Sequence, residues 1–168
     1  VLIEHKLDYP KDLVTAGQYG SFHITRKSEG KADESVRFNL IGASEPDVTI
    51  VTYGGLVEMV LEAAEQAYID SEIVSEIYAP AQIGPVDTTL FAKSVRNSGC
   101  LLTIEEGTRT LGYGSEVLAQ LGESPETQNV SMGRVAAFDT FVPSSQINES
   151  NMLPSIHQIQ QKIISLVD

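Results

Sequence analysis

Two segments in which an apolar strand leads directly into a helix constrain the fold more than any other feature of this chain. Val48–Gly55 reads VTIVTYGG and runs into a stretch whose apolar side chains share one helical face, with glutamates on the other. Leu101–Val117 reads LLTIEEGTRTLGYGSEV and has the same order of strand, glycine-rich loop and helix start. Consecutive strand-to-helix units are typical of parallel strands joined by crossover helices, so the pattern predicts a parallel α/β sheet.

Further elements of the same kind follow along the chain. A second strand is expected over Ile73–Tyr78, a helix over Thr88–Val95 with Asp87 as its N-cap, and a strand around RVAA. The last helix is expected to start near Pro154, after a loop over Pro143–Asn151. The predicted fold is therefore α/β, a three-layer α/β/α sandwich with a mostly parallel sheet of four to five strands.

The first 45 residues lack this regular alternation. The run Arg26–Glu34 mixes charges of both signs and is expected to be a solvated loop, whereas Val36–Leu40 alternates like a half-exposed strand. We therefore predict an irregular N-terminal arm over residues 1–45 and a compact domain over residues 46–168. The chain opens on Val1, within a strand-like run, which suggests a fragment of a longer polypeptide.

Charge and composition exclude some partners. The formal net charge is −12, which repels nucleic-acid phosphates and would attract a basic protein partner. No apolar run reaches the 18 residues that a membrane span needs, so neither a nucleic acid nor a membrane is an expected partner. The single cysteine, Cys100, cannot form an internal disulfide, and a reducing intracellular setting fits best.

The loop Gly112–Ser115 precedes a helix, and its backbone N–H groups could hold an anion. A dinucleotide fingerprint would need three spaced glycines after the first strand, and a phosphate loop would end in Gly-Lys-Ser/Thr. Neither pattern is present. We therefore interpret the loop as a tight turn that lets the helix pack against the sheet.

Glu105 and Glu106 follow a strand at its carboxyl end, where ligands bind in open α/β sheets. Neighbouring residues of a strand point to opposite faces, so these carboxylates are not expected to converge on one substrate atom. A structural role is predicted instead, in which Glu106 caps a nearby helix or pairs with Arg109. The three histidines lie far apart in the sequence, and no metal-ligand spacing or Gly-x-Ser-x-Gly elbow occurs.

Five segments, in order, resemble one family: VLIEHKLDY, DVTIVTYGGLVEMVLEAAE, PVDTTLFAKSVRNSGCLLTIEEGTRTLGYGSEV, RVAAFDTFVPSS and MLPSIHQIQQKI. They are similar to the transketolase C-terminal domain of the β subunit of thiamine-diphosphate-dependent 2-oxoacid dehydrogenases, of the pyruvate or branched-chain type. The chain departs from that pattern at Tyr78–Ala81, where the family often has Asp-Leu-Arg. The arm Lys11–Glu34 is also longer and more polar than the family pattern.

The resemblance implies a division of labour. Thiamine diphosphate and magnesium would belong to the full enzyme, between the α subunit and the N-terminal domain of the β subunit, and residues 1–45 would include the end of that pyrimidine-binding domain. No catalytic, cofactor-binding or metal residue of the family falls on this chain. Its role would be assembly with the dehydrogenase α portion and a second β subunit, and docking of the basic subunit-binding domain of dihydrolipoyl acyltransferase. The candidate partner-binding residues are Glu105, Glu106, Arg109 and Asp168.

The resemblance further implies a cytoplasmic location in bacteria or the mitochondrial matrix in eukaryotes. Two alternatives stay open. One is a stand-alone binding module of α/β fold whose pocket is lined by the loops Tyr53–Leu56 and Glu105–Gly114. The other is the same domain of a transketolase-like enzyme, such as transketolase itself or a synthase of deoxyxylulose phosphate.

Overall fold

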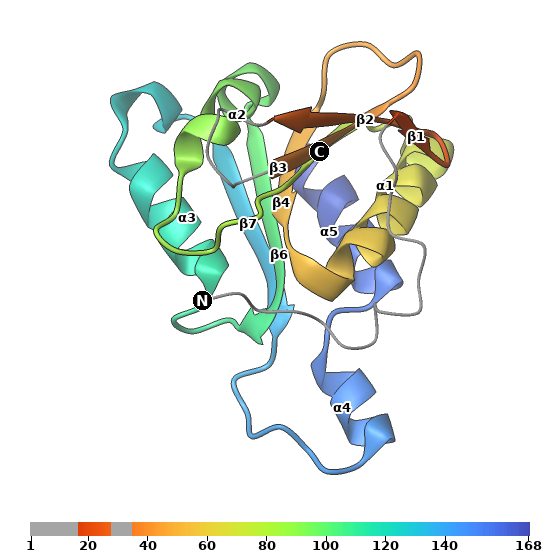
Figure 1. The fold of residues 1–168 in the computed structure, drawn as a ribbon, viewed down its shortest axis with the longest axis vertical. Helices are drawn as coiled ribbons and strands as arrows, with labels where there is room; N and C mark the ends of the chain where they lie inside the picture. The colour runs from red at the N-terminus through yellow and green to blue at the C-terminus, as the bar shows by residue number, and fades with distance from the viewer. Residues whose placement is uncertain (1–16, 28–34) are drawn as a thin grey trace.

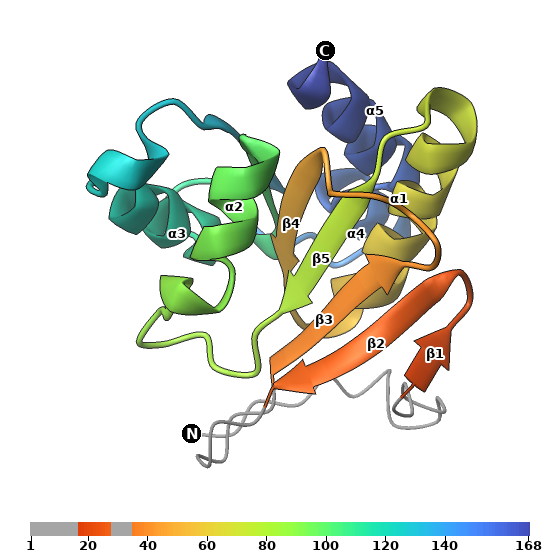
Figure 2. The same ribbon diagram turned by 90° about the horizontal axis from the view of Figure 1, so that it is seen from above.

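The architecture was obtained as a computed structural model, which describes residues 17–27 and 35–168. A single sheet of seven strands, in the order β1-β2-β3-β5-β4-β6-β7, forms its centre (Figure 2). The strands are β1 (Gly17–Tyr19), β2 (Phe22–Lys27), β3 (Ser35–Leu40), β4 (Val48–Thr52), β5 (Ser75–Ala79), β6 (Cys100–Thr108) and β7 (Ser131–Ala137). The helices are α1 (Val57–Ser71), α2 (Ala92–Ser98), α3 (Tyr113–Gly122), α4 (Gln146–Met152) and α5 (Ile156–Val167).

The sheet has a parallel part and an antiparallel part. β5, β4, β6 and β7 run parallel, with Ile50 paired to Ile77 on one side and to Leu102 on the other. β1, β2 and β3 are antiparallel to one another, and β3 joins the parallel part by pairing antiparallel to β5. The predicted parallel α/β sheet is thus present and is extended along one edge.

Helices cover both faces of the parallel part, as expected for strands buried on two sides (Figure 1). Neighbouring strand residues separate into two cores: Ile50 and Leu102 pack with α1 and α5, whereas Val51 and Leu101 pack with α2 and α3. Successive side chains of a strand point to opposite faces of the sheet, so two adjacent apolar residues pack into two different cores. The predicted three-layer α/β/α fold class is confirmed.

The sheet has seven strands rather than four to five, because part of the predicted arm adds three strands to it. Of the residues in the predicted arm, 17–19, 22–27 and 35–40 lie in β1, β2 and β3, and β3 confirms the strand predicted over Val36–Leu40. Phe22 and Ile24 alternate with His23 and Thr25, the pattern of an antiparallel strand with one buried face. The strand expected in VLIEHKL and most of the polar loop lie outside the described residues. The division at residue 45 stays a prediction, and β3 and β5 pair across it.

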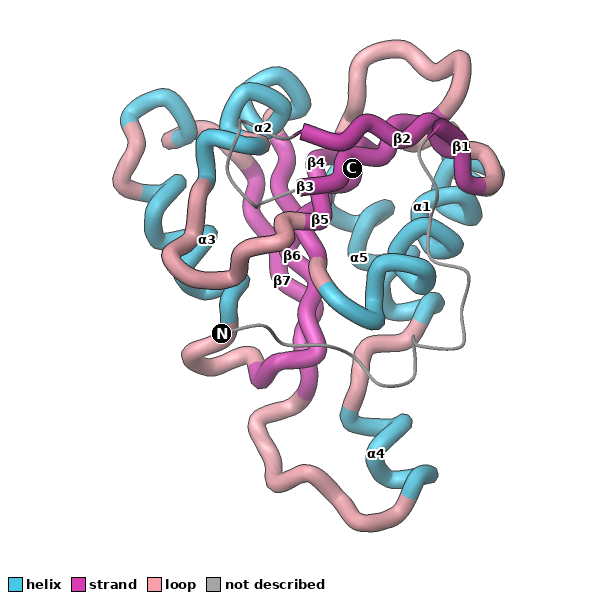
Figure 3. The backbone as a smooth tube through the Cα atoms, viewed as in Figure 1, coloured by secondary structure: helices cyan, strands magenta, loops and turns pink. Residues whose placement is uncertain are grey.

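One predicted loop contains a helix. Pro143–Asn151 was expected to be irregular, but α4 begins there, capped by the Ser145 hydroxyl, which accepts a hydrogen bond from Asn148 N at 3.3 Å. The stretch from the end of β7 to the start of α5 projects beyond the sheet as a loop, a short helix and a second loop (Figure 3). We call residues 138–152 the excursion. Among the described helices, none has the length and apolarity to cross a membrane.

Candidate functional site

The carboxyl ends of β4 and β6 form the place where this fold would bind a ligand. The two strands are neighbours, yet the chain leaves β4 for α1 on one face and leaves β6 for α3 on the other. Open α/β sheets bind ligands at such a switch of direction. A depression of about 580 Å³ lies there, lined by the loops that follow β4, β5 and β6.

Glu105 occupies the floor of this depression and is tied to the start of α3. Its side chain is buried, with 1% of its surface exposed. One carboxylate oxygen accepts a hydrogen bond from Tyr113 N at 2.8 Å, and the other accepts one from Gly114 N at 2.9 Å. The helix N-terminus therefore already holds an anion, supplied by the protein's own strand.

The glycines of the loop make room for this carboxylate. A Cβ atom at Gly112 would lie 2.5 Å from Glu105 Oε1, and one at Gly114 would collide with the Thr103 hydroxyl. The loop is thus the tight turn that we predicted. We predicted that Glu106 caps a nearby helix or pairs with Arg109. The start of α3 is capped by Glu105 instead, whose carboxylate accepts the hydrogen bonds from Tyr113 N and Gly114 N.

Two tyrosines complete the floor. The rings of Tyr53 and Tyr113 meet edge to face, with centroids 5.3 Å apart, and the Tyr53 hydroxyl lies 3.5 Å from Glu105 Oε2. Burial, with the Glu105 charge as a further cause, raises the pKa of Tyr53 to about 12. Burial also raises the pKa of Tyr113 to about 12, and its hydroxyl has no hydrogen-bond partner among the described residues.

These groups do not form a catalytic arrangement. The depression is lined by the carboxylates of Glu105 and Glu116, and by no lysine, arginine or histidine of the described chain. In the same part of the chain, no group of three or more histidine, cysteine, aspartate or glutamate side chains could hold a metal ion. The chemistry available is hydrogen bonding to a neutral or cationic group.

The four candidate partner-binding residues do not gather at one place. Glu105 is buried, Glu106 is half-buried and Arg109 is exposed at the carboxyl edge of the sheet. Among the described residues, no ion pair joins Glu106 to Arg109. Asp168 lies at the opposite edge, since α5 ends beside the start of β6, where Cys100 Sγ donates to Leu166 O at 3.6 Å. Figure 1 shows the C-terminus at the end of the molecule away from α4.

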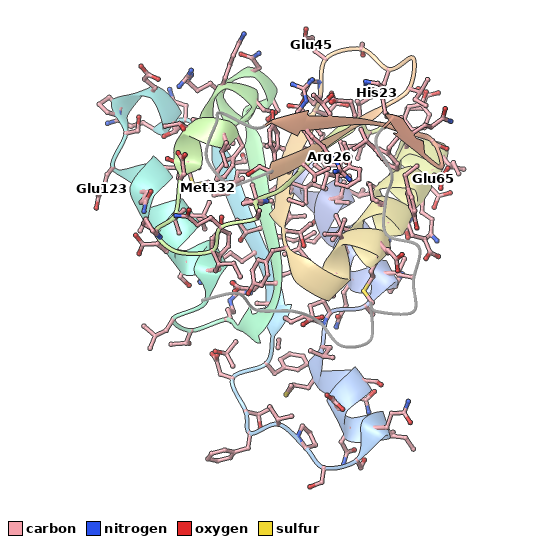
Figure 4. The ribbon with its side chains drawn as sticks, viewed as in Figure 1. His23, Arg26, Glu45, Glu65, Glu123 and Met132 are labelled. Carbon is pink, nitrogen blue, oxygen red and sulfur yellow. The ribbon has the colours of Figure 1, made fainter. Side chains whose placement is uncertain are left out.

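Sequence reasoning missed an exposed apolar surface at the carboxyl edge. Of the nine large apolar side chains that are exposed in the described chain, six belong to it. We call them the carboxyl-edge surface: Ile83, Leu111, Phe138, Phe141, Val142 and Ile147. In Figure 4 the side chains of the excursion project away from the sheet, except at its end, where Met152 is buried. The signal in the sequence was the pair Phe141-Val142 directly before Pro143, in a segment with no helical or strand period.

Comparison with known proteins gives one family. Residues 39–159 match the family model of the transketolase C-terminal domain. The pyruvate dehydrogenase E1 component subunit beta of Staphylococcus aureus is 33% identical over 117 residues, which are 69% of this chain and 35% of that protein. The 3-methyl-2-oxobutanoate dehydrogenase subunit beta of Mycobacterium tuberculosis is 31% identical over 111 residues, 66% of this chain and 32% of that protein. The chain thus spans about a third of the length of these relatives.

Solved structures show the same fold. A split-gene transketolase, described as an inactive beta4 tetramer, has a TM-score of 0.64 and 26% identity over 74% of this chain and 40% of its own. A 2-oxoglutarate:ferredoxin oxidoreductase of Magnetococcus marinus has a TM-score of 0.53 and covers 82% of this chain, which is 20% of its own. The second match is 13% identical and concerns the fold alone.

Proposed function

Because the chain belongs to the transketolase C-terminal domain family, we propose that it is the C-terminal assembly and partner-docking domain of a thiamine-diphosphate-dependent 2-oxoacid dehydrogenase. The match over residues 39–159 carries this proposal, together with relatives that are β subunits of pyruvate and 3-methyl-2-oxobutanoate dehydrogenases. The full enzyme would decarboxylate a 2-oxoacid such as pyruvate or 2-oxoisovalerate and transfer the acyl group to lipoamide.

The described residues do not fit the cofactor of that reaction. A diphosphate needs N–H groups or cations, but Glu105 occupies the N–H groups at the start of α3. Glu116 adds a second negative charge to the depression, whose described lining holds no cation. Thiamine diphosphate and magnesium would therefore be held by other parts of the enzyme, and this domain would contribute no catalytic residue.

The partners of the domain would be the dehydrogenase α portion, a second β subunit and the subunit-binding domain of dihydrolipoyl acyltransferase. The net charge of −12 supports docking of a basic domain. Asp168 lies at the edge of the sheet opposite the carboxyl-edge surface, so a charged contact and an apolar contact can be made at the same time. The location would be the cytoplasm, or the mitochondrial matrix in a eukaryote.

Calorimetry and activity assays test the proposal. The 168-residue chain is titrated with thiamine diphosphate and magnesium, and is assayed for decarboxylation of pyruvate and 2-oxoisovalerate. We expect neither heat of binding nor activity. Cofactor binding by this chain alone with a Kd of about 1 μM would overturn the proposal that other parts of the enzyme hold the cofactor.

The depression at the carboxyl edge supports a second candidate function, a small-ligand module. Its volume of about 580 Å³ lies in the range of ligand sites, and it sits at the switch of direction between β4 and β6. Its two carboxylates restrict the ligand to a neutral or cationic compound. A screen of such compounds by thermal shift, repeated on Tyr53→Phe, would support this candidate if a stabilising hit lost its effect in the variant.

A further inference from the structure

We propose that the depression at the carboxyl ends of β4 and β6 binds an organic ammonium compound, with the cationic group near Glu105 and Glu116 and an apolar body against the surrounding loops. The inference rests on the second candidate function, a small-ligand module, and it names the class of the ligand. Three features of the depression carry it: two carboxylates without a cationic partner, two tyrosine rings and an apolar wall.

The negative charge in the depression has no cationic partner. Glu105 is 1% exposed, and among the described residues no ion pair reaches it or Glu116. The N–H groups of Tyr113 and Gly114 satisfy hydrogen bonds of Glu105 but carry no net charge. Glu116 accepts a hydrogen bond from the neutral side-chain amide of Gln120 at 2.9 Å. Because buried charges in proteins are normally paired, a cationic ligand would complete this arrangement.

The start of α3 does not cancel this charge. The N-terminus of a helix carries about half of a positive elementary charge. The carboxylate of Glu105 carries a full negative charge and that of Glu116 a second one, so the sum at the depression stays near −1.5 elementary charges, on the order given by these values. A cation is therefore attracted to the depression, whereas an anion is repelled.

The electrostatic environment of the two tyrosines is negative as well. Burial is the first cause of their raised pKa values, and nearby carboxylates add to it, Glu105 and Glu106 at Tyr53, and Asp87 and Glu105 at Tyr113. No lysine or arginine of the described chain opposes this effect. Both hydroxyls stay protonated at neutral pH, so the rings remain uncharged. A cation gains about 0.5–2 kcal/mol from the face of such a ring.

The wall of the depression provides apolar contacts for the rest of the compound. Ile83, Pro85 and Val86 line it from the loop after β5, and Leu111 lines it from the loop after β6. Leu111 is 97% exposed and Ile83 is 40% exposed, so both side chains can lose contact with water when a ligand binds. An amine with an apolar body is the ligand class that uses the carboxylates, the rings and this wall together.

Titration of the 168-residue chain with phenethylammonium at neutral pH and constant ionic strength, followed by nuclear magnetic resonance, tests the proposal. We expect saturable shifts of the backbone amides of Tyr53, Gly112 and Tyr113, with a Kd of about 1 mM. Phenethyl alcohol has nearly the same shape but no charge, and it should bind at least about tenfold more weakly. Hydrocinnamate carries the opposite charge and should give no saturable shift.

Two variants of α3 separate the site from the general charge of the chain. Glu116→Gln removes one charge from the lining and should weaken binding of phenethylammonium at least about threefold. The matched control is Glu123→Gln, which removes the same charge just beyond the other end of α3, where the side chain points away from the molecule (Figure 4). It should leave the Kd unchanged. The amide spectrum of each variant also shows whether it is folded.

Three outcomes would contradict the inference. Equal binding of phenethyl alcohol would mean that the depression recognises the apolar body alone. Equal weakening by Glu116→Gln and Glu123→Gln would mean that the overall negative charge attracts the amine. Absence of saturable shifts at the three amides up to about 20 mM would mean that the depression binds no such compound. The proposed assembly function is tested separately, by titration with thiamine diphosphate and magnesium, and does not depend on any of these results.

Discussion

Glu105 of β6 accepts hydrogen bonds from the first N–H groups of α3, and substitution of Glu105 tests this capping role. Glu105→Ala would leave the buried groups Tyr113 N and Gly114 N without their hydrogen-bond acceptor. We therefore expect the free energy of unfolding to fall by about 3 kcal/mol. Glu106→Ala, at the neighbouring half-buried position, is the control and should change the free energy of unfolding by less than about 1 kcal/mol. Urea denaturation of both variants decides, and equal losses would contradict the capping role.

Leu111 has a backbone conformation that is strained for a leucine, with φ 60°. Glycine adopts the left-handed region without strain, so Leu111→Gly should raise the free energy of unfolding by about 1 kcal/mol. Urea denaturation of the two proteins measures the difference. A loss of stability would mean that the Leu111 side chain makes contacts that outweigh the strain.

Two half-buried tyrosines, Tyr53 and Tyr113, make stability depend on alkaline pH. The folded chain raises the pKa of Tyr53 and of Tyr113 from 10.0 to about 12, so it retains a proton that the unfolded chain releases. Their contribution is therefore complete below pH 10 and is lost as the pH rises from 10 towards 12. We expect the unfolding midpoint in urea to fall in this window. The fall should be smaller in Tyr53→Phe, whereas Tyr68→Phe, which removes an exposed hydroxyl, is the control.

At the scale of elements, sequence and structure agree where the apolar period was strong. The strands at Val48 and Leu101 and the helices after them were predictable, because continuous apolar runs and one-sided helices both arise from burial in two cores. α4 was missed because five of its seven residues are polar. Its two apolar residues, Ile147 and Met152, are five positions apart and give no helical period. β1, β2 and β3 were missed as a sheet, because their burial depends on pairing with β5. Local pattern does not report such distant pairing.

The three antiparallel strands are part of the cooperative fold. Phe38 of β3 is buried in the core that includes α1 and α5, although it lies before the predicted boundary at residue 45. Phe38→Ala should therefore reduce the free energy of unfolding of the whole chain by about 3–5 kcal/mol in a single transition. Denaturation followed by both fluorescence and circular dichroism measures it. Two separate transitions, with only one shifted by the substitution, would show that the arm folds apart from the domain.

For the whole molecule, the residues that identify the domain differ from the apolar residues that it exposes. The segment Leu101–Val117 was recognisable because its glycines and Glu105 are needed to build the helix start. The carboxyl-edge surface was not recognisable, since an exposed apolar residue and a buried one look alike in a sequence. Candidate contacts chosen by charge were accordingly scattered between the two edges of the sheet, from Arg109 to Asp168.

The net charge of −12 predicts how docking of a basic subunit-binding domain depends on salt. Such docking depends on attraction between opposite charges, so its affinity should fall several-fold between about 50 and 500 mM NaCl, because salt screens that attraction. Calorimetric titrations at the two salt concentrations measure the change. An affinity that stayed the same would contradict a docking contact held by charge.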